Sequence, residues 1–285
     1  MDRRVFLLSA LAASSLSARP GKAKLELSLA AYSYERHLSL RSKKKPTMTL
    51  EDFIDEAARL KLPAVELTAY YFRETTDDYL KTIKARVAKH GMAVSGTAVG
   101  NDFCWPDDSK RGEQLDMVKR WTERTALLGG KTMRIFAGTV KKGDTEADAV
   151  KRTLDAVAKA VEHAAKHKIK LAMENHGGIT ATADQLLALI KPIKSEWYGV
   201  NLDTGNFRTP DPYADLAKIA MYAVSVQLKT EIFPGGKRED ADLPRLIDIL
   251  RKADYRGYVA LEYEAKEDPR EAVPVAIEKL KKLLA

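Results

Sequence analysis

Short apolar runs alternate with longer stretches of helical periodicity along most of the chain, in a regular rhythm. A short apolar run between turn residues predicts a buried strand, and a longer amphipathic stretch predicts a helix. The predicted strands are Leu25–Tyr34, Ala64–Leu67, Ala93–Ala98, Thr132–Ala137, Lys170–Glu174, Tyr198–Asp203, Ala223–Lys229 and Gly257–Glu262. The predicted helices are Leu50–Lys61, Asp77–His90, Lys110–Leu128, Thr145–Lys168, Ala183–Ile193, Tyr213–Ala220, Leu243–Ala253 and Arg270–Leu284.

This order of elements predicts an α/β fold, a closed (β/α)8 TIM barrel. An open doubly wound sheet usually has about five or six strands, and this pattern has eight, each followed by a helix. Residue pairs typical of helix starts support the helices: Thr49 with Asp52, Asp211 with Pro212, and Asp268 with Pro269. Because no Pro/Ser-rich linker divides the chain, residues 25–285 are predicted to form one domain.

The first residues predict an export signal. Arg3 and Arg4 stand directly before an apolar run from Val5 to Ala18, which is too short for a bilayer span of about 20 residues but suits a signal peptide. The paired arginines resemble a twin-arginine signal. Residues 1–24 are therefore expected to direct export, with a periplasmic or otherwise exported protein and no stable membrane insertion. A frayed tail or an uncleaved anchor is the other interpretation, with a cytoplasmic location as the alternative.

Composition excludes several classes of protein. Apolar residues make up 45% and charged residues 31%, which is typical of a soluble globular protein. The single cysteine, Cys104, cannot form an internal disulfide. The net charge is +8, but five basic residues and one acidic residue among the first 24 account for +4, so nucleic acid is not an expected partner. No G-x-G-x-x-G or G-x-x-x-x-G-K-[ST] sequence exists, and a nucleotide cofactor is not expected.

Polar side chains end four consecutive predicted strands. These are Glu174, Asp203, Gln227 and Glu262, on strands five to eight. In such a barrel the carboxyl ends of the strands form the active site. Converging carboxylates repel one another unless a cation lies among them, and oxygen ligands favour Mn²⁺ or Mg²⁺ over zinc. Each residue alone is equally compatible with a capped or salt-bridged strand end, whereas the four together predict a metal site.

Three segments that carry these residues resemble the sugar phosphate isomerase/epimerase family, with its xylose isomerase-like TIM barrel. They are Glu174-Asn175-His176-Gly177-Gly178, Asn201-Leu202-Asp203-Thr204-Gly205-Asn206 and Leu261-Glu262. The resemblance extends from about Leu25 to the C-terminus. It implies that Glu174, Asp203, Gln227 and Glu262 bind the metal.

The sequence departs from the family pattern at two positions. Many epimerases have histidine where this chain has Gln227, and some dehydratases that act on dehydroshikimate are similar to it in having glutamine there. Asn206 stands where ketose epimerases and the related DNA-repair endonucleases have histidine. With only His176 near the expected mouth, the three-metal cluster of those endonucleases cannot form, so DNA repair is disfavoured.

Further residues are candidates for substrate binding. Lys229 lies two residues after Gln227, on the same strand face, and is expected to reach a substrate oxygen unless it is an exposed strand-end lysine. Arg134 on strand four and Glu66 on strand two either point inward, as a binder of a substrate oxyanion and a support for the site, or each form a barrel salt bridge. His176 either contacts a sugar hydroxyl or has a structural hydrogen bond. Asn206, in the Asp203–Asn206 segment, completes the candidate substrate-binding set.

These residues lead to a functional hypothesis with two alternatives. The first is a metal-dependent isomerase or epimerase of a small-molecule sugar or sugar derivative. A metal would acidify the proton beside a carbonyl and stabilise the enediolate, and Glu174 and Glu262 would be the catalytic residues that move the proton. The alternatives are a lyase or dehydratase acting through the same enolate, towards which Gln227 leans, and a non-catalytic periplasmic sugar-binding barrel.

Overall fold

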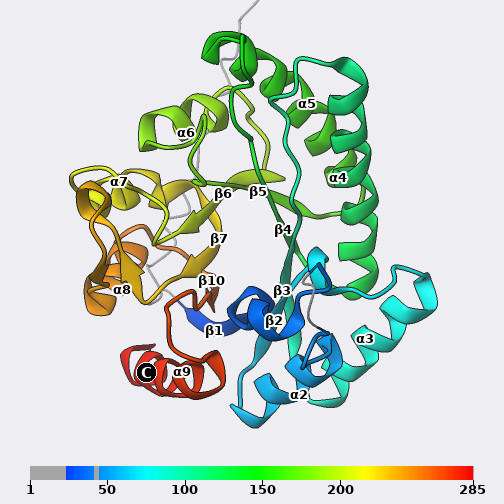
Figure 1. Cartoon of the computed structure of the whole chain (residues 1–285), viewed down its shortest axis with the longest axis vertical. Coiled ribbons are helices and arrows are strands. Elements are labelled where there is room, and N and C mark those ends of the chain that lie inside the picture. Colours follow the sequence, from blue (N-terminus) through cyan, green and yellow to red (C-terminus); the bar gives the residue numbers. More distant parts are fainter. Residues whose placement is uncertain (1–23, 42–44, 285) are drawn as a thin grey trace, which may run out of the picture.

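The computed structural model describes residues 24–41 and 45–284, and within them eight parallel strands close into a barrel (Figure 1). The strands are β1 (Leu25–Ala30), β2 (Ala64–Thr68), β3 (Ala93–Ala98), β4 (Thr132–Ile135), β5 (Lys170–Glu174), β6 (Tyr198–Asp203), β7 (Ala223–Leu228) and β10 (Gly257–Leu261). Strand β1 pairs with both β2 and β10, which closes the ring. The predicted (β/α)8 barrel is confirmed.

Helices surround the ring of strands (Figure 1). They are α2 (Leu50–Arg59), α3 (Asp77–Lys89), α4 (Asp108–Leu128), α5 (Glu146–Lys166), α6 (Ala183–Ile190), α7 (Pro212–Ile219), α8 (Leu243–Lys252) and α9 (Pro269–Leu284). Side-chain caps fix where they begin. The Thr49 hydroxyl accepts from the Asp52 backbone N–H at 3.1 Å, and the Asp52 carboxylate accepts from the Thr49 N–H at 2.8 Å. This reciprocal pair satisfies two donors that a helix start leaves unpaired.

The first predicted strand was four residues too long. Strand β1 ends at Ala30, and the chain continues as the short helices η1 (Ala31–Tyr34) and α1 (Glu35–Leu38). The Ser33 hydroxyl donates to the Leu261 carbonyl at 3.0 Å and accepts from the Tyr263 N–H at 2.9 Å. These two hydrogen bonds join the turn after β1 to the end of β10, so the turn forms part of the barrel mouth.

A small hairpin lies between β7 and α8. Its strands are β8 (Glu231–Ile232) and β9 (Glu239–Asp240), which pair antiparallel and form a sheet separate from the barrel. The hairpin was not predicted, because strands of two residues have no hydrophobic period that a sequence can show.

Side chains alternate between the inside of the barrel and the layer of helices. On β7 the outward residues Val226 and Leu228 are fully buried in the apolar core. The inward residues are polar along much of the barrel, as in the Ser28–Ser95 pair, whose hydroxyl oxygens lie 2.8 Å apart. The barrel interior is therefore partly a hydrogen-bonded polar layer, and this layer continues to the carboxyl ends of the strands.

No helix within residues 24–41 and 45–284 is long and apolar enough to span a bilayer. The expected export signal at residues 1–24 falls almost entirely on residues 1–23, which lie outside the described residues, and it stays a prediction.

Candidate active site at the barrel mouth

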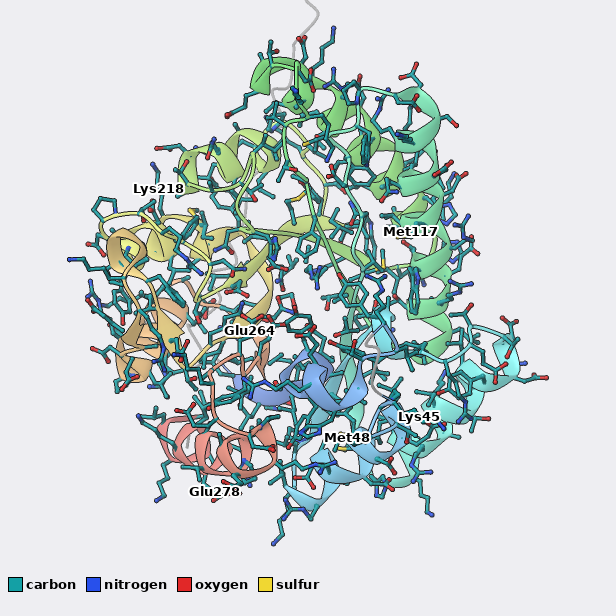
Figure 2. All side chains as sticks on the ribbon, in the orientation of Figure 1. Lys45, Met48, Met117, Lys218, Glu264 and Glu278 are labelled. Carbon is teal, nitrogen blue, oxygen red and sulfur yellow. The ribbon has the colours of Figure 1, made fainter. Side chains whose placement is uncertain are left out.

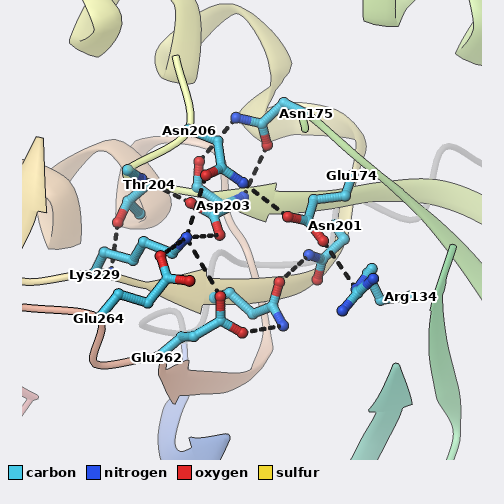
Figure 3. A network of polar contacts seen from close by, with 12 residues as sticks. Arg134, Glu174, Asn175, Asn201, Asp203, Thr204, Asn206, Lys229, Glu262 and Glu264 are labelled. Atoms are coloured by element: carbon cyan, nitrogen blue, oxygen red, sulfur yellow. Dashed lines mark hydrogen bonds and ion pairs between the residues drawn. The ribbon is translucent and has the colours of Figure 1, made fainter. Parts of the chain in front are cut away.

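The four polar strand ends lie together at the carboxyl end of the barrel. Glu174 ends β5, Asp203 ends β6, Gln227 is the penultimate residue of β7, and Glu262 directly follows β10. All four are buried, with at most 5% of each residue exposed. Figure 3 shows Glu174, Asp203 and Glu262 pointing into the same region from separate strands. The convergence expected from the sequence is present, and its function remains a prediction.

Lys229 pairs with two carboxylates of this group. Its ammonium lies 3.2 Å from Asp203 Oδ2 and 3.4 Å from Glu262 Oε1, and it also forms an ion pair with Glu264. Burial alone would lower the pKa of Lys229, but these carboxylates outweigh it and raise the pKa well above its ordinary value. With 6% of the residue exposed, Lys229 is a fixed internal cation and not an exposed strand-end lysine.

Arg134 is a second internal cation. Its Nε lies 2.9 Å from Glu174 Oε2, and its Nη1 donates to the Val99 carbonyl at 2.8 Å. The guanidinium carbon also lies 4.0 Å from the centre of the Phe136 ring. Arg134 therefore points inward and forms a salt bridge with Glu174 at the barrel mouth. Asn206 donates to the other Glu174 oxygen at 2.8 Å and accepts from Lys229 at 3.2 Å, which links the two cations.

Gln227 connects two carboxylates deeper in the barrel. Its amide nitrogen donates to Glu66 Oε1 at 2.7 Å and to Glu262 Oε2 at 2.9 Å. Its amide oxygen accepts from the Asn201 amide at 2.5 Å. Glu66, which is 2% exposed, therefore points inward and contacts the site through Gln227, without an ion pair to Arg134 among the described contacts.

The buried carboxyl groups at the mouth outnumber the two cations, Arg134 and Lys229, that face them. Burial raises the pKa of Glu174 to about 8 even though Arg134 opposes the shift, and burial likewise raises the pKa values of Asp203 and Glu262. Asp203 Oδ2 and Glu174 Oε2 face cations but accept no hydrogen bond within the described residues. Oxygen donors with excess negative charge fit a hard divalent cation. Gln227 presents its amide nitrogen to Glu66 and Glu262, so ligation of a cation through its oxygen requires the amide to turn.

A cavity of about 290 Å³ opens above these groups. Its lining includes Arg134, Glu174, Lys229 and Glu262 together with His176. The His176 ring lies 4.2 Å from the Phe136 ring, and partial burial, aided by the charges of Arg134 and Lys229, lowers the pKa of His176 to about 4. His176 is therefore neutral at pH 7 and can both donate and accept a hydrogen bond at the cavity wall.

Several lining residues were missed by the sequence analysis. They are Glu35, Arg41, Tyr70, Tyr71, Phe136 and Glu264. Glu264 carried a usable signal, because it stands two residues after Glu262 just as Lys229 stands two after Gln227. In Figure 2 Glu264 projects over the middle of the molecule, whereas Lys218 and Glu278 lie on the outer helices. The aromatic residues follow strand ends and have no pattern that separates them from core residues.

A second group of metal-ligand type lies away from the mouth. Ligand atoms of Glu123 on α4 and of His163 and His167 at the end of α5 lie within 4.8 Å of one another. Glu123 Oε1 is 3.1 Å from His163 Nε2. Any measurement of bound metal must therefore separate this surface group from the barrel mouth.

Comparison with known proteins gives a family and a set of similar folds. Residues 54–283 match the sequence model of a family described as "Xylose isomerase-like TIM barrel". No curated protein matches the chain. Among solved structures, D-psicose 3-epimerase with D-tagatose from Clostridium cellulolyticum H10 has 13% identity and a TM-score of 0.73, covering 91% of this chain and 99% of that one.

Two further solved structures are similar in fold. The 3-keto-D-glucoside 4-epimerase from E. coli has 16% identity and a TM-score of 0.70, with 92% of this chain and 100% of that chain covered. The IOLI protein, described with a binding zinc atom, has 17% identity and a TM-score of 0.71, with 90% and 96% covered. At these identities the likeness shows the fold.

A close approach at Gly205 generates a prediction. A Cβ at this position would lie 2.7 Å from Lys229 Cδ and 2.9 Å from the Glu231 carbonyl oxygen. We expect Gly205→Ala to displace Lys229 and to lower the free energy of unfolding by about 1–3 kcal/mol, measured by urea denaturation. The control is Gly112→Ala in α4, where a Cβ meets nothing within 4 Å and the free energy of unfolding should rise by roughly 0.5–1 kcal/mol. Equal unfolding midpoints for Gly205→Ala and wild type would contradict the expected clash.

Proposed function

The chain belongs to the xylose isomerase-like TIM-barrel family, and from this membership we propose that it is a metal-dependent isomerase or epimerase of a sugar or sugar derivative. The observation that carries the proposal is that Glu174 and Glu262, from different strands, line the same cavity as Lys229 and Arg134. Similar folds described as a D-psicose 3-epimerase and a 3-keto-D-glucoside 4-epimerase support this reaction class.

Proton transfer next to a carbonyl is the proposed chemistry. Mn²⁺ or Mg²⁺ held by Glu174, Asp203, Gln227 and Glu262 would supply a Lewis acid for the substrate carbonyl. Either Glu174 or Glu262 removes a proton from the neighbouring carbon, and the other carboxyl group returns one. Return to the opposite face of the same carbon gives an epimer, whereas return to the former carbonyl carbon gives an isomer.

The remaining polar residues have supporting roles in this proposal. Lys229 and Arg134 carry fixed positive charges that stabilise negative charge developing on the substrate oxygen. Because they are already held by carboxylates and by the Val99 carbonyl, little reorganisation is needed when that charge develops. His176 and Asn206 are proposed to bind sugar hydroxyl groups, and Glu66 to fix Gln227.

A lyase is the second candidate, and the position of Lys229 favours it. Its ammonium is 3.4 Å from Glu262 Oε1, so a proton donor lies next to a proposed base. In a substrate with a β-hydroxyl group, the enolate would expel that group, Lys229 would protonate it as it leaves as water, and Glu262 would return the abstracted proton to Lys229.

We also propose that the protein is exported. The paired residues Arg3 and Arg4 before the apolar run are the support for this location. The proposed substrate is then a carbohydrate available outside the cytoplasm.

Exchange with solvent tests the proposed function. Full-length protein with added Mn²⁺ is incubated in D₂O with D-psicose, D-tagatose and 3-keto-D-glucosides, and the sugars are followed by NMR spectroscopy and mass spectrometry. Deuterium in recovered or epimerised sugar is the expected result, because the abstracted proton exchanges with solvent. An unsaturated product would indicate the lyase. Tight binding without exchange or product would overturn both and leave a sugar-binding barrel.

Metal analysis tests the ligand set. Protein purified without chelator should hold about one Mn²⁺, Mg²⁺ or similar ion per chain that depends on the mouth carboxylates. Elemental analysis is made on wild type, on Asp203→Asn and on His167→Ala. The expected result is loss of the ion in Asp203→Asn and retention in His167→Ala, which removes a ligand of the surface group. The reverse pattern would place the metal on α4 and α5.

Replacing Glu262 tests the two-carboxylate mechanism. Glu262→Gln keeps the size and one oxygen but removes the proton-accepting capacity, so turnover at saturating metal should fall by roughly 10²–10⁴-fold. Glu113→Gln, on the exposed side of α4, is the control and should retain wild-type turnover. Thermal unfolding is measured in parallel, since a structural role would lower stability together with activity. Near-normal turnover of a stable Glu262→Gln protein would exclude Glu262 as the acid or base.

A further inference from the structure

A second cavity adjoins the one above the carboxylates. Its volume is about 350 Å³, and it shares Tyr32, Glu35, Lys229 and Glu264 with the first cavity, whose volume is about 290 Å³. The Lys229–Glu264 ion pair stands at the junction, with one side toward each cavity. The two cavities are therefore lobes of one cleft, and only the first lobe contains Glu174 and Glu262.

Aromatic and planar polar groups line the second lobe. Phe233 and Tyr263 contribute rings, and the Arg208 guanidinium carbon lies 3.7 Å from the centre of the Phe233 ring. Arg208 also donates to the Gly205 carbonyl at 2.5 Å, which fixes the stacked pair to the loop after β6. Rigid aromatic faces beside directed hydrogen-bond donors suit a ring that has apolar C–H faces and hydroxyl groups at its edge.

The charges in the second lobe argue against a phosphate group. Arg36 donates to the carbonyls of Ala265, Lys266 and Glu267, so its guanidinium is already occupied. Glu35, Glu231 and Glu264 also line the lobe and offset its three cations, Arg36, Arg208 and Lys229. A dianion would meet as many carboxylates as cations, whereas a neutral hydroxylated ring meets partners of both kinds.

Resting on the proposed function, we propose that the substrate is a glycoside with two units, a keto-sugar ring in the first lobe and a second ring in the second lobe. Ligand pockets for larger small molecules span roughly 300–1,000 Å³, and the first lobe alone, at about 290 Å³, falls just below this range. The linkage between the units would pass the Lys229–Glu264 pair. Phe233 and Arg208 then determine specificity for the second unit, without contact to the reacting carbon.

Matched one-ring and two-ring compounds test this inference. In the first pair, methyl 3-keto-D-glucoside is the one-ring compound and phenyl 3-keto-D-glucoside the two-ring compound. In the second pair, these are D-fructose and maltulose. D-glucose 6-phosphate is measured beside both pairs as a probe for a phosphate site. Binding is measured by calorimetry with Mn²⁺-loaded full-length protein, and deuterium exchange is measured separately. In at least one pair the two-ring compound should bind at least tenfold more tightly than its one-ring partner. D-glucose 6-phosphate should not bind more tightly than the one-ring compounds.

Two variants locate the effect. Phe233→Ala should weaken binding of the two-ring compound roughly tenfold or more and change the one-ring compound less than about twofold. Arg208→Ala should act in the same direction, and it removes an exposed side chain if Phe233→Ala proves unstable. The matched control is Arg245→Ala, because the Arg245 guanidinium carbon lies 4.0 Å from the Tyr213 ring in a similar stack that lines neither lobe.

The outcomes separate this inference from the proposed function. Equal affinity for the two members of both pairs, equal losses for both members in Phe233→Ala, or preference for the phosphorylated sugar would overturn the two-unit substrate. Absence of exchange with any compound, despite selective binding of the two-ring one, would overturn the proposed enzyme activity and leave the two-lobed binding site standing.

Discussion

Compensation of buried negative charge is the constraint on which the barrel mouth depends. Glu66, Glu174, Asp203 and Glu262 are each at most 5% exposed, and ionised carboxylates in such positions are costly unless cations or donors face them. The protein supplies Arg134 for Glu174 and Lys229 for Asp203 and Glu262. Two cations thus face four buried carboxylates, and burial raises the pKa of Glu174 to about 8. The proposed divalent cation would balance the remaining negative charge.

Charge compensation also explains the choice of uncharged partners. The Gln227 amide gives one hydrogen each to Glu66 and Glu262, so it separates two carboxylates without adding charge. Asn206 bridges Glu174 and Lys229 in a comparable way. Both amides stand where the family resemblance of the sequence implies histidine in many epimerases. An amide keeps its hydrogen-bonding pattern at every physiological pH, whereas histidine changes its pattern when it titrates.

The sequence predicted the elements that show a hydrophobic period and the polar residues that lie at the ends of strands. The eight barrel strands and Glu174, Asp203 and Glu262 at their ends followed from alternation and topology. Contacts made by side chains from distant segments did not follow. The sequence could not show that Arg134 pairs with Glu174 and not with Glu66, since both partners are inward-pointing carboxylates. The turn at Ala31–Tyr34 also depends on Ser33 contacts with residues near the end of the chain.

The hairpin of β8 and β9 has a consequence for how the protein can change over evolution. Its two strands pair only with each other, while the eight barrel strands hydrogen-bond in a closed ring. Insertions, deletions or substitutions in residues 231–240 therefore alter the rim near Phe233 without shifting the register of any barrel strand. Descendants of one ancestral barrel could exchange this segment and acquire different ligand preferences while the carboxylate cluster stays constant. Directed evolution can use the same separation by randomising the hairpin alone.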